Sequence, residues 1–376
     1  TQQVSSAASD VYKRQACTRA LYHSDTLDTT MVTRSMDWEG YDQGVVRGVP
    51  RGTVLDTRAP TVYGVDLNKS GGAHQVYKSK HAMIEIASFD AEFVTEAINE
   101  HGVLGQIHYL NTDWQDEKAR VKGNQDIDGQ RFVQYVIANA KSLDEVESII
   151  NNTNIRDQKL GGVPGLYDAN TTVNHFLAHF IFADNSGETV LVEMVNGEKK
   201  LYRGTGSLDV ISNNPTFDTM TEMDRELLSE KRFPTASINS IDRRYRAQYA
   251  LKEVKAYEER FGIRDNKQLS NIIEGVAHEM RSGYTKWDVA YDANFPTLWV
   301  SQVDLKNKTL KLDRWDTDQV ETYDFSMFDV NGKQVVELGR NTNKRESQPC
   351  TNINKNQPFC ALSLIHISEP TRHTRI

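Results

Sequence analysis

The chain has 376 residues, of which 26% are charged and 38% hydrophobic, and its 44 Lys plus Arg against 52 Asp plus Glu give a net charge of −8. This composition is that of a globular protein and not of a disordered one, and the length allows one large domain or two ordinary ones. The acidic balance argues against a general nucleic-acid binder. Because no run of 18 apolar residues occurs, no transmembrane helix is predicted.

The two ends of the chain differ from the sequence between them. Residues 1–15 are polar and lack the apolar stretch of a signal peptide, and residues 363–376 break from the preceding sequence. We interpret residues 1–16 as a non-native or cleaved leader, 17–345 as a single domain, and 346–376 as a C-terminal extension whose last part, 363–376, is non-native. Genuine flexible termini are the alternative.

Short β segments alternate with turn residues along much of the chain. The pattern predicts a hairpin from 18–22 and 31–36, a strand over 81–88, a turn at 99–102 before a strand over 103–109, a hairpin from 176–184 and 189–195 around Asn185-Ser186-Gly187, and a late hairpin from 297–305 and 309–312.

Four segments have helical periodicity, namely 130–141, 143–151, 241–261 and 266–279. Arg243 lies on the apolar stripe of the third, four residues before Ala247, so its side chain needs a buried partner. Ser240 is predicted to cap this helix. Strands come first, helices cluster in the middle and strands return, which predicts an α+β fold of antiparallel sheets layered with helices.

Nucleotide and zinc motifs are missing from the sequence. It contains no G-x-x-x-x-G-K-[ST] and no H-E-x-x-H, and the ten histidines show no zinc spacing. We therefore predict no metal site. His179, within an apolar segment, is interpreted as a hydrogen-bonded core residue and not as a ligand.

Three cysteines are present. Cys350 and Cys360 lie ten residues apart in a polar stretch, and we predict a disulfide between them if the protein is exported, with two free thiols as the alternative. Cys17 is left without a partner, and the small Ala16 before it resembles a signal-peptidase site. Cleavage there would give Cys17 an α-amine with a pKa of about 8, which can take up the proton of its own thiol.

Charged residues on the next predicted strand fit this chemistry. Arg34 supplies the positive charge that a thiolate needs, and Asp37 can orient the terminal ammonium. Because these two residues are three positions apart, a regular strand would place them on opposite faces. For both to reach Cys17, the strand must end or bulge near residues 35–37.

Five short motifs in the same order resemble the choloylglycine hydrolase family, the bile-salt hydrolases and penicillin V acylases. They are Ala16-Cys17-Thr18-Arg19 with Arg34-Ser35-Met36-Asp37-Trp38, then residues 98–103 (INEHGV), 177–187, 210–217 (VISNNPTF) and 242–247 (DRRYRA). The resemblance covers about residues 17–312. It implies a four-layer αββα sandwich of the N-terminal nucleophile hydrolases and hydrolysis of a linear, non-peptide amide bond.

The resemblance also assigns roles by position. Cys17 would be the nucleophile and its amine the general base, with Arg34 and Asp37 beside it. Tyr109 and Asn213 would hold the oxyanion, and Arg243 would be the last active-site arginine. Residue 109 corresponds to a position that is commonly asparagine in bile-salt hydrolases and tyrosine in some penicillin V acylases.

This sequence also departs from the family pattern. Arg244 stands where phenylalanine is usual, which makes Arg246 a competitor of Arg243, and Glu96-Ala97 replaces the usual Asp-Gly. The same residues could instead have only structural roles. These would be a buried structural thiol at Cys17, a surface ion pair of Arg34 with Asp37, a turn at Asn213 and a core aromatic at Tyr109.

The sequence thus predicts a periplasmic or secreted acylase of penicillin V or N-acyl homoserine lactone type. Its partner would be a small acyl amide, the family allows a homotetramer, and no metal or organic cofactor is implied. A bile-salt hydrolase is the alternative within the family. A second class stays open, in which Cys17 is acylated as a lipoprotein cysteine and the chain is a tethered binding protein; in that case both nucleophile and base would be lost.

Overall fold

The computed structural model describes residues 17–38, 42, 44–58, 74–88, 93–157, 178–229, 237–283, 296–314 and 320–341. The predicted Cys350–Cys360 disulfide and both terminal segments lie outside these residues. Within the described residues, no helix is both long and apolar enough to cross a membrane.

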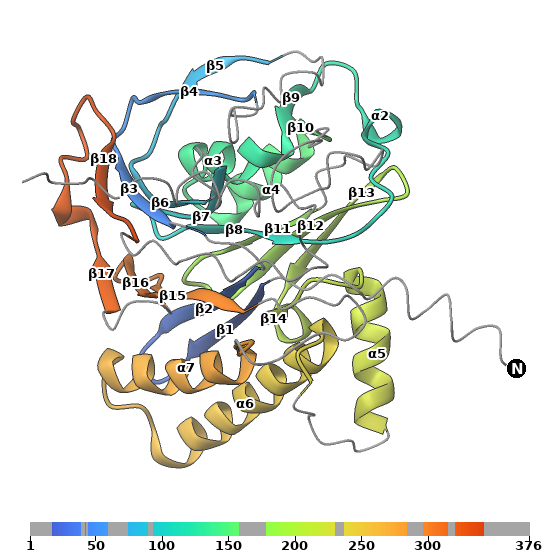
Figure 1. The fold of residues 1–376 in the computed structure, drawn as a ribbon, viewed down its shortest axis with the longest axis vertical. Helices are drawn as coiled ribbons and strands as arrows, with labels where there is room; N and C mark the ends of the chain where they lie inside the picture. Colours follow the sequence, from blue (N-terminus) through green and yellow to red (C-terminus); the bar gives the residue numbers. More distant parts are fainter. Residues whose placement is uncertain are drawn as a thin grey trace, which may run out of the picture.

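Two antiparallel sheets form the centre of the molecule (Figure 1). The six-stranded sheet has the order β14 (Val210–Ile211), β1 (Thr18–Ser24), β2 (Thr29–Asp37), β15 (Thr297–Asp304), β16 (Thr309–Arg314) and β17 (Val320–Tyr323). The eight-stranded sheet has the order β13 (Glu198–Gly204), β12 (Thr189–Val195), β11 (Ala178–Ala183), β8 (Leu104–Tyr109), β7 (Phe93–Asn99), β6 (Met83–Ser88), β3 (Val45–Val49) and β18 (Val336–Gly339).

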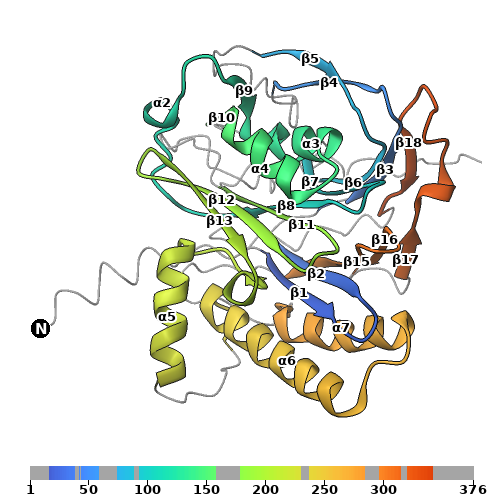
Figure 2. The same ribbon diagram turned by 180° about the vertical axis from the view of Figure 1, so that it is seen from behind.

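Helices cover the outer face of each sheet (Figures 1 and 2). Helix α3 (Gly129–Asn139), with α4 (Leu143–Asn151) beside it, packs against β7 and β8, whereas α6 (Ser240–Phe261) and α7 (Asn266–Met280) pack against β1 and β2. The layers are therefore helix, sheet, sheet, helix, which confirms the αββα order implied by the resemblance. Smaller elements are α2 (Asp116–Ala119), α5 (Phe217–Ser229), the pairs β4 (Val54–Asp56) with β5 (Val76–Lys78) and β9 (Gln125–Asp128) with β10 (Thr153–Arg156), and 3-10 turns at Gly206–Leu208 and Phe325–Met327.

Strand parity divides the side chains of the six-stranded sheet between two cores. Leu21, Val32 and Met36 belong to the core between the sheets, whereas Ala20 and Met31 face α6 and α7. Since both faces are covered, all nine residues of β2 are buried. A polar side chain on this strand must therefore find its partner inside the protein.

Most of the predicted elements are confirmed. The hairpin β1–β2 aligns Thr18 with Ser35 and Ser24 with Thr29, and α4 has the predicted bounds. The predicted cap of the long helix is wrong by one residue, because the side chain of Asn239 accepts the hydrogen bond from the Asp242 N–H at 2.8 Å. Ser240 is the first helical residue, and its hydroxyl donates to Ser212 Oγ at 2.9 Å.

Glu258 on α6 fastens this helix to the β1–β2 hairpin. Its carboxylate accepts hydrogen bonds from Ser24 Oγ at 2.6 Å and Thr26 N at 2.9 Å, and another from the Tyr22 hydroxyl. Burial raises the pKa of Glu258, but these hydrogen bonds outweigh burial and lower the pKa below its ordinary value.

We expect Glu258→Gln to lower the free energy of unfolding at pH 7 by about 1–3 kcal/mol, because hydrogen bonds to a charged acceptor are lost. A group whose folded pKa is lowered contributes stability above its unfolded pKa, about 4.3, and loses it as the pH falls through the folded pKa. The difference between wild type and variant in urea denaturation should therefore shrink below pH 4. A difference that grows as the pH falls would contradict this assignment.

Candidate active site

Cys17 lies directly before β1, at the edge of the core between the two sheets, and its side chain is buried. The thiol donates to Met36 Sδ at 3.5 Å, and Arg34 Nη2 donates to Cys17 Sγ at 3.3 Å. The backbone N–H of Asp37 also bonds to this sulfur. The sulfur thus contacts Arg34, Met36 and the backbone of Asp37 near the end of β2, so the structure brings both predicted charged residues close to Cys17.

The guanidinium of Arg34 bridges the two sheets. It leaves β2 and donates to the backbone oxygens of Thr95 at 2.8 Å and Ile107 at 2.9 Å, on β7 and β8 of the opposite sheet. It also lies over the ring of Trp299, 5.1 Å from the ring centroid. These contacts fix the guanidinium beside the sulfur without using a surface partner, so the surface ion-pair interpretation does not apply.

Glu96 is a site residue that the sequence did not identify as such. Its Oε2 lies 3.4 Å from Arg34 Nη1 and accepts from Ser301 Oγ at 2.9 Å and Gln106 Nε2 at 3.1 Å. Burial raises the pKa of Glu96, and Arg34 opposes that effect. Glu96 therefore positions Arg34 from the side away from the sulfur. The only sign of it in the sequence was a departure from the family pattern at this position.

The electrostatics of Cys17 combine two opposing effects. Burial raises the pKa of the thiol above its ordinary value, and the nearby charge of Arg34 lowers it. Because burial is the larger effect, the thiol is protonated at neutral pH. A reaction at this sulfur therefore needs a base that removes the proton as the thiolate attacks.

Asp37 faces the helix layer, opposite to Arg34, as strand parity requires. Its carboxylate forms an ion pair with Arg243 Nη1 and accepts from Thr297 Oγ1 at 2.6 Å and Ser35 Oγ at 3.0 Å. The strand ends at Asp37, and the register irregularity falls opposite it, between Thr297 and Trp299 on β15. Of the two predicted alternatives, the end of strand β2 near residues 35–37 is confirmed. The shift in register lies on the neighbouring strand β15.

Arg243 connects Asp37 to the remaining predicted residues. Its Nη2 donates to Asn213 Oδ1 at 3.2 Å, and its Nε donates to the Ile238 oxygen at 3.0 Å. Asn213, just after β14, donates from Nδ2 to the backbone oxygen of Tyr109 at 2.9 Å, at the end of β8. The six predicted residues thus form one continuous set of contacts from Arg34 through Cys17 to Tyr109.

The structure also separates the three arginines at the start of α6. Arg243 is fully buried and contacts Asp37. Arg244 pairs instead with Asp224 at 2.6 Å, and Arg246 donates to the backbone oxygens of Ser237 and Glu279. Arg243, which the resemblance assigned to the site, therefore contacts Asp37, and its competitor Arg246 does not.

His179 is buried and its Nδ1 lies 3.1 Å from Glu193 Oε1, which confirms a hydrogen-bonded core residue. Among the described residues, one group of three side chains has metal-ligating atoms close together, namely Glu100 and His101 in the β7–β8 turn and His81 before β6.

The four-layer αββα arrangement is the fold of the N-terminal nucleophile hydrolases. Residues 17–241 match the family described as linear amide C-N hydrolases, choloylglycine hydrolase family, and the chain belongs to this family. It is a hydrolase of carbon–nitrogen bonds in linear amides, other than peptide bonds.

Three distant relatives each cover more than four fifths of the chain. A bile salt hydrolase/transferase of Bifidobacterium longum is 22% identical over 340 residues, 84% of this chain and 98% of the relative. The structure of penicillin V acylase from Agrobacterium tumefaciens superposes with a TM-score of 0.68 at 19% identity, covering 86% of this chain and 92% of that one. A mutant conjugated bile acid hydrolase from Clostridium perfringens gives a TM-score of 0.64 at 15% identity, covering 86% and 96%.

Proposed function

We propose that this chain is an exported acylase in which the thiol of Cys17 attacks a linear acyl amide of the penicillin V or N-acyl homoserine lactone type. The observation that carries the proposal is the position of Cys17 Sγ, 3.3 Å from Arg34 Nη2 and linked through Asp37 and Arg243 to Asn213. A structural thiol would need none of these charged neighbours.

The first chemical step requires a free amine on Cys17. Cleavage after Ala16 would supply it, and at a pKa of about 8 this amine is unprotonated in part at neutral pH. It takes the thiol proton as the sulfur attacks the acyl carbonyl, while Arg34 stabilises the developing thiolate. Asp37 accepts a hydrogen bond from the resulting ammonium and fixes its direction.

The later steps use the same groups in reverse. Tyr109 and Asn213 stabilise the oxyanion of the tetrahedral intermediate. The ammonium of Cys17 then gives its proton to the leaving nitrogen, the C–N bond breaks, and the acyl group stays on sulfur as a thioester. Water, deprotonated by the same amine, attacks this thioester and releases the carboxylic acid and the free thiol.

Two observations bear on the acyl group. Tyrosine at position 109 favours the penicillin V acylase type, and the likeness to the solved Agrobacterium enzyme agrees with that choice. Bile-salt hydrolysis is the second candidate, because curated relatives carry that activity. A panel of phenoxyacetyl amides, N-acyl homoserine lactones and conjugated bile acids, compared by kcat/KM, separates the two.

The decisive experiment compares two forms of the protein by intact mass, iodoacetamide labelling and amidase activity. One is expressed with a restored signal peptide, and the other keeps residues 1–16. We expect the first to begin at an unmodified Cys17 and to lose activity as the label is taken up, and the second to be inactive. Turnover by a verified unprocessed chain would exclude the amine as base. A mass increment of lipid size on Cys17 would instead indicate a tethered binding protein.

A further inference from the structure

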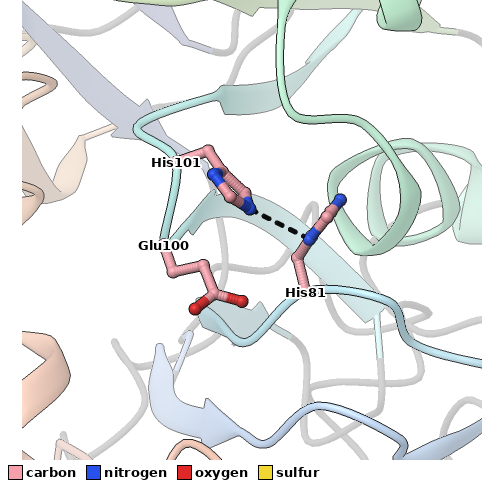
Figure 3. Close-up of side chains that lie close together, drawn as sticks. All are labelled: His81, Glu100 and His101. Atoms are coloured by element: carbon pink, nitrogen blue, oxygen red, sulfur yellow. Dashed lines mark hydrogen bonds between the residues drawn. The ribbon is translucent and has the colours of Figure 1, made fainter.

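Two histidines that are distant in the sequence meet at the β7–β8 turn (Figure 3). His101 Nε2 lies 3.1 Å from His81 Nδ1, and the rings are edge to face with centroids 4.4 Å apart. The carboxylate of Glu100 lies beside them, and one ligand atom from each of the three residues lies within 4.8 Å of the other two. The sequence spacing gave no sign of this group, since 20 residues separate the two histidines.

Several hydrogen bonds hold the backbone around the group. The N–H groups of Lys80 and His81 both donate to the Ala138 oxygen, at 2.9 and 3.1 Å, at the C-terminal end of α3. Ala82 and Glu100 bond reciprocally, Glu100 N to Ala82 O at 3.0 Å and Ala82 N to Glu100 Oε1 at 2.9 Å.

Asn99 fixes the turn that carries the other two side chains. Its Oδ1 accepts from the N–H groups of His101 at 3.0 Å and Val103 at 3.1 Å, and its Nδ2 donates to the Ile137 and Ala140 oxygens at 2.9 and 2.6 Å. The three side chains therefore leave from backbone positions that are set before any ligand arrives, which reduces the entropy lost on binding.

The donor set suits a particular class of cation. Two imidazole nitrogens and a carboxylate are ligands of zinc and its late first-row neighbours. Zinc–nitrogen bonds of about 2.0–2.1 Å in a tetrahedral site bring two nitrogens to about 3.3 Å from each other, close to the 3.1 Å observed for the two rings. Each neutral ring would then carry its proton on the nitrogen that faces away.

Glu100 retains the capacity to join such a site. A carboxylate has about four lone-pair positions. Here Oε1 accepts from Ala82 N and from Arg51 Nε at 2.7 Å, and Oε2 pairs with Arg51 Nη2. These three donors orient the carboxylate and leave one position on Oε2 for a cation.

We propose that His81, Glu100 and His101 form a binding site for a divalent late first-row cation, represented by zinc, with water completing the coordination. The site would fasten the β7–β8 turn to the segment before β6 and to the end of α3. Asn99 lies three residues beyond Glu96 on β7, so the turn is about 10 Å or more from the partner of Arg34. The bound cation would therefore act on stability and not on the amide chemistry.

Zinc binding to the full-length protein tests the proposal. The protein is prepared without a histidine tag, and a chelator removes any bound metal. All free thiols are then blocked with iodoacetamide so that cysteine cannot bind the added metal. Calorimetric titration with Zn²⁺ should give one bound ion per chain. Thermal unfolding in the presence of Zn²⁺ should give a higher Tm than in its absence. His81→Ala and His101→Lys should each weaken binding at least tenfold and abolish the Tm shift, while their circular dichroism and their amidase activity before thiol blocking stay those of the wild type.

His278→Gln is the matched control, because His278 is an exposed histidine of α7 outside the group. It should bind zinc as the wild type does. Equal zinc binding by wild type, His81→Ala and His101→Lys would show adventitious surface binding and overturn the proposal. Absence of any stoichiometric uptake would also overturn it and leave the pair as two hydrogen-bonded imidazoles.

Discussion

Replacing Cys17 by serine is expected to reduce kcat roughly 10³-fold or more, as loss of a nucleophile does in other hydrolases. The reason is specific to the site. Arg34, at 3.3 Å from the sulfur, partly offsets the effect of burial on the thiol and stabilises the thiolate as the amine removes the proton, whereas an alcohol is far less acidic than a thiol and the same contact does not compensate for that difference. Activity on the best amide of the panel, measured on a chain that begins at residue 17, checks this result.

The controls separate chemistry from folding. Serine is close to cysteine in size and its hydroxyl can still donate a hydrogen bond, so the urea midpoint of Cys17→Ser should stay near that of the wild type. The double variant Cys350→Ser, Cys360→Ser changes the other two cysteines, which lie outside the described residues, and should keep its activity. Turnover at the wild-type rate by Cys17→Ser would contradict the role of Cys17.

Local patterns were enough to predict much of the fold. The turn at Asn185-Ser186-Gly187 joins β11 and β12 as expected, because hairpin turns depend on neighbouring residues. Strand β7 was missed, since Glu96 stands in the middle of it and breaks the apolar pattern. The charge is tolerated there because Arg34 comes from the opposite sheet, 62 positions away in the sequence. No window of neighbouring residues contains that information.

The residues of the candidate site also divide into those that the sequence predicted and those that only the structure identified. Cys17, Arg34 and Asp37 could be predicted from the sequence, because the predicted hairpin brings them together and a family motif contains them. Tyr109 and Asn213 came from the resemblance, and Arg243 came from both its inward position on a predicted helix and the resemblance. The structure places all three in one set of contacts with the first three. The supporting residues Glu96, Thr297 and Ser301 were not predicted, because each acts through a partner on another strand.

Asp37→Asn is expected to lower the free energy of unfolding by about 3–5 kcal/mol, the range found when one partner of a buried ion pair is removed. Arg243 is fully buried, so in this variant its charge would keep only neutral partners such as Asn213 and the Ile238 oxygen. Amidase activity should fall as well, because the proposed amine would lose the carboxylate that orients it. Urea denaturation at pH 7 measures the first effect.

A matched ion pair and a double-mutant cycle distinguish burial from mere pairing. Arg281 Nη2 and Asp313 Oδ2 are 2.5 Å apart, with exposed side-chain fractions of 12% and 27%, so this pair is partly solvated and Asp313→Asn should cost less than Asp37→Asn. In Asp37→Asn, Arg243→Met the unpaired charge is gone, and much of the stability lost in Asp37→Asn should return. If Asp37→Asn cost no more than Asp313→Asn, the pair could not hold α6 against the end of β2. Some other contact would then have to link Asn213 and Tyr109 to the end of β2 that contacts Cys17.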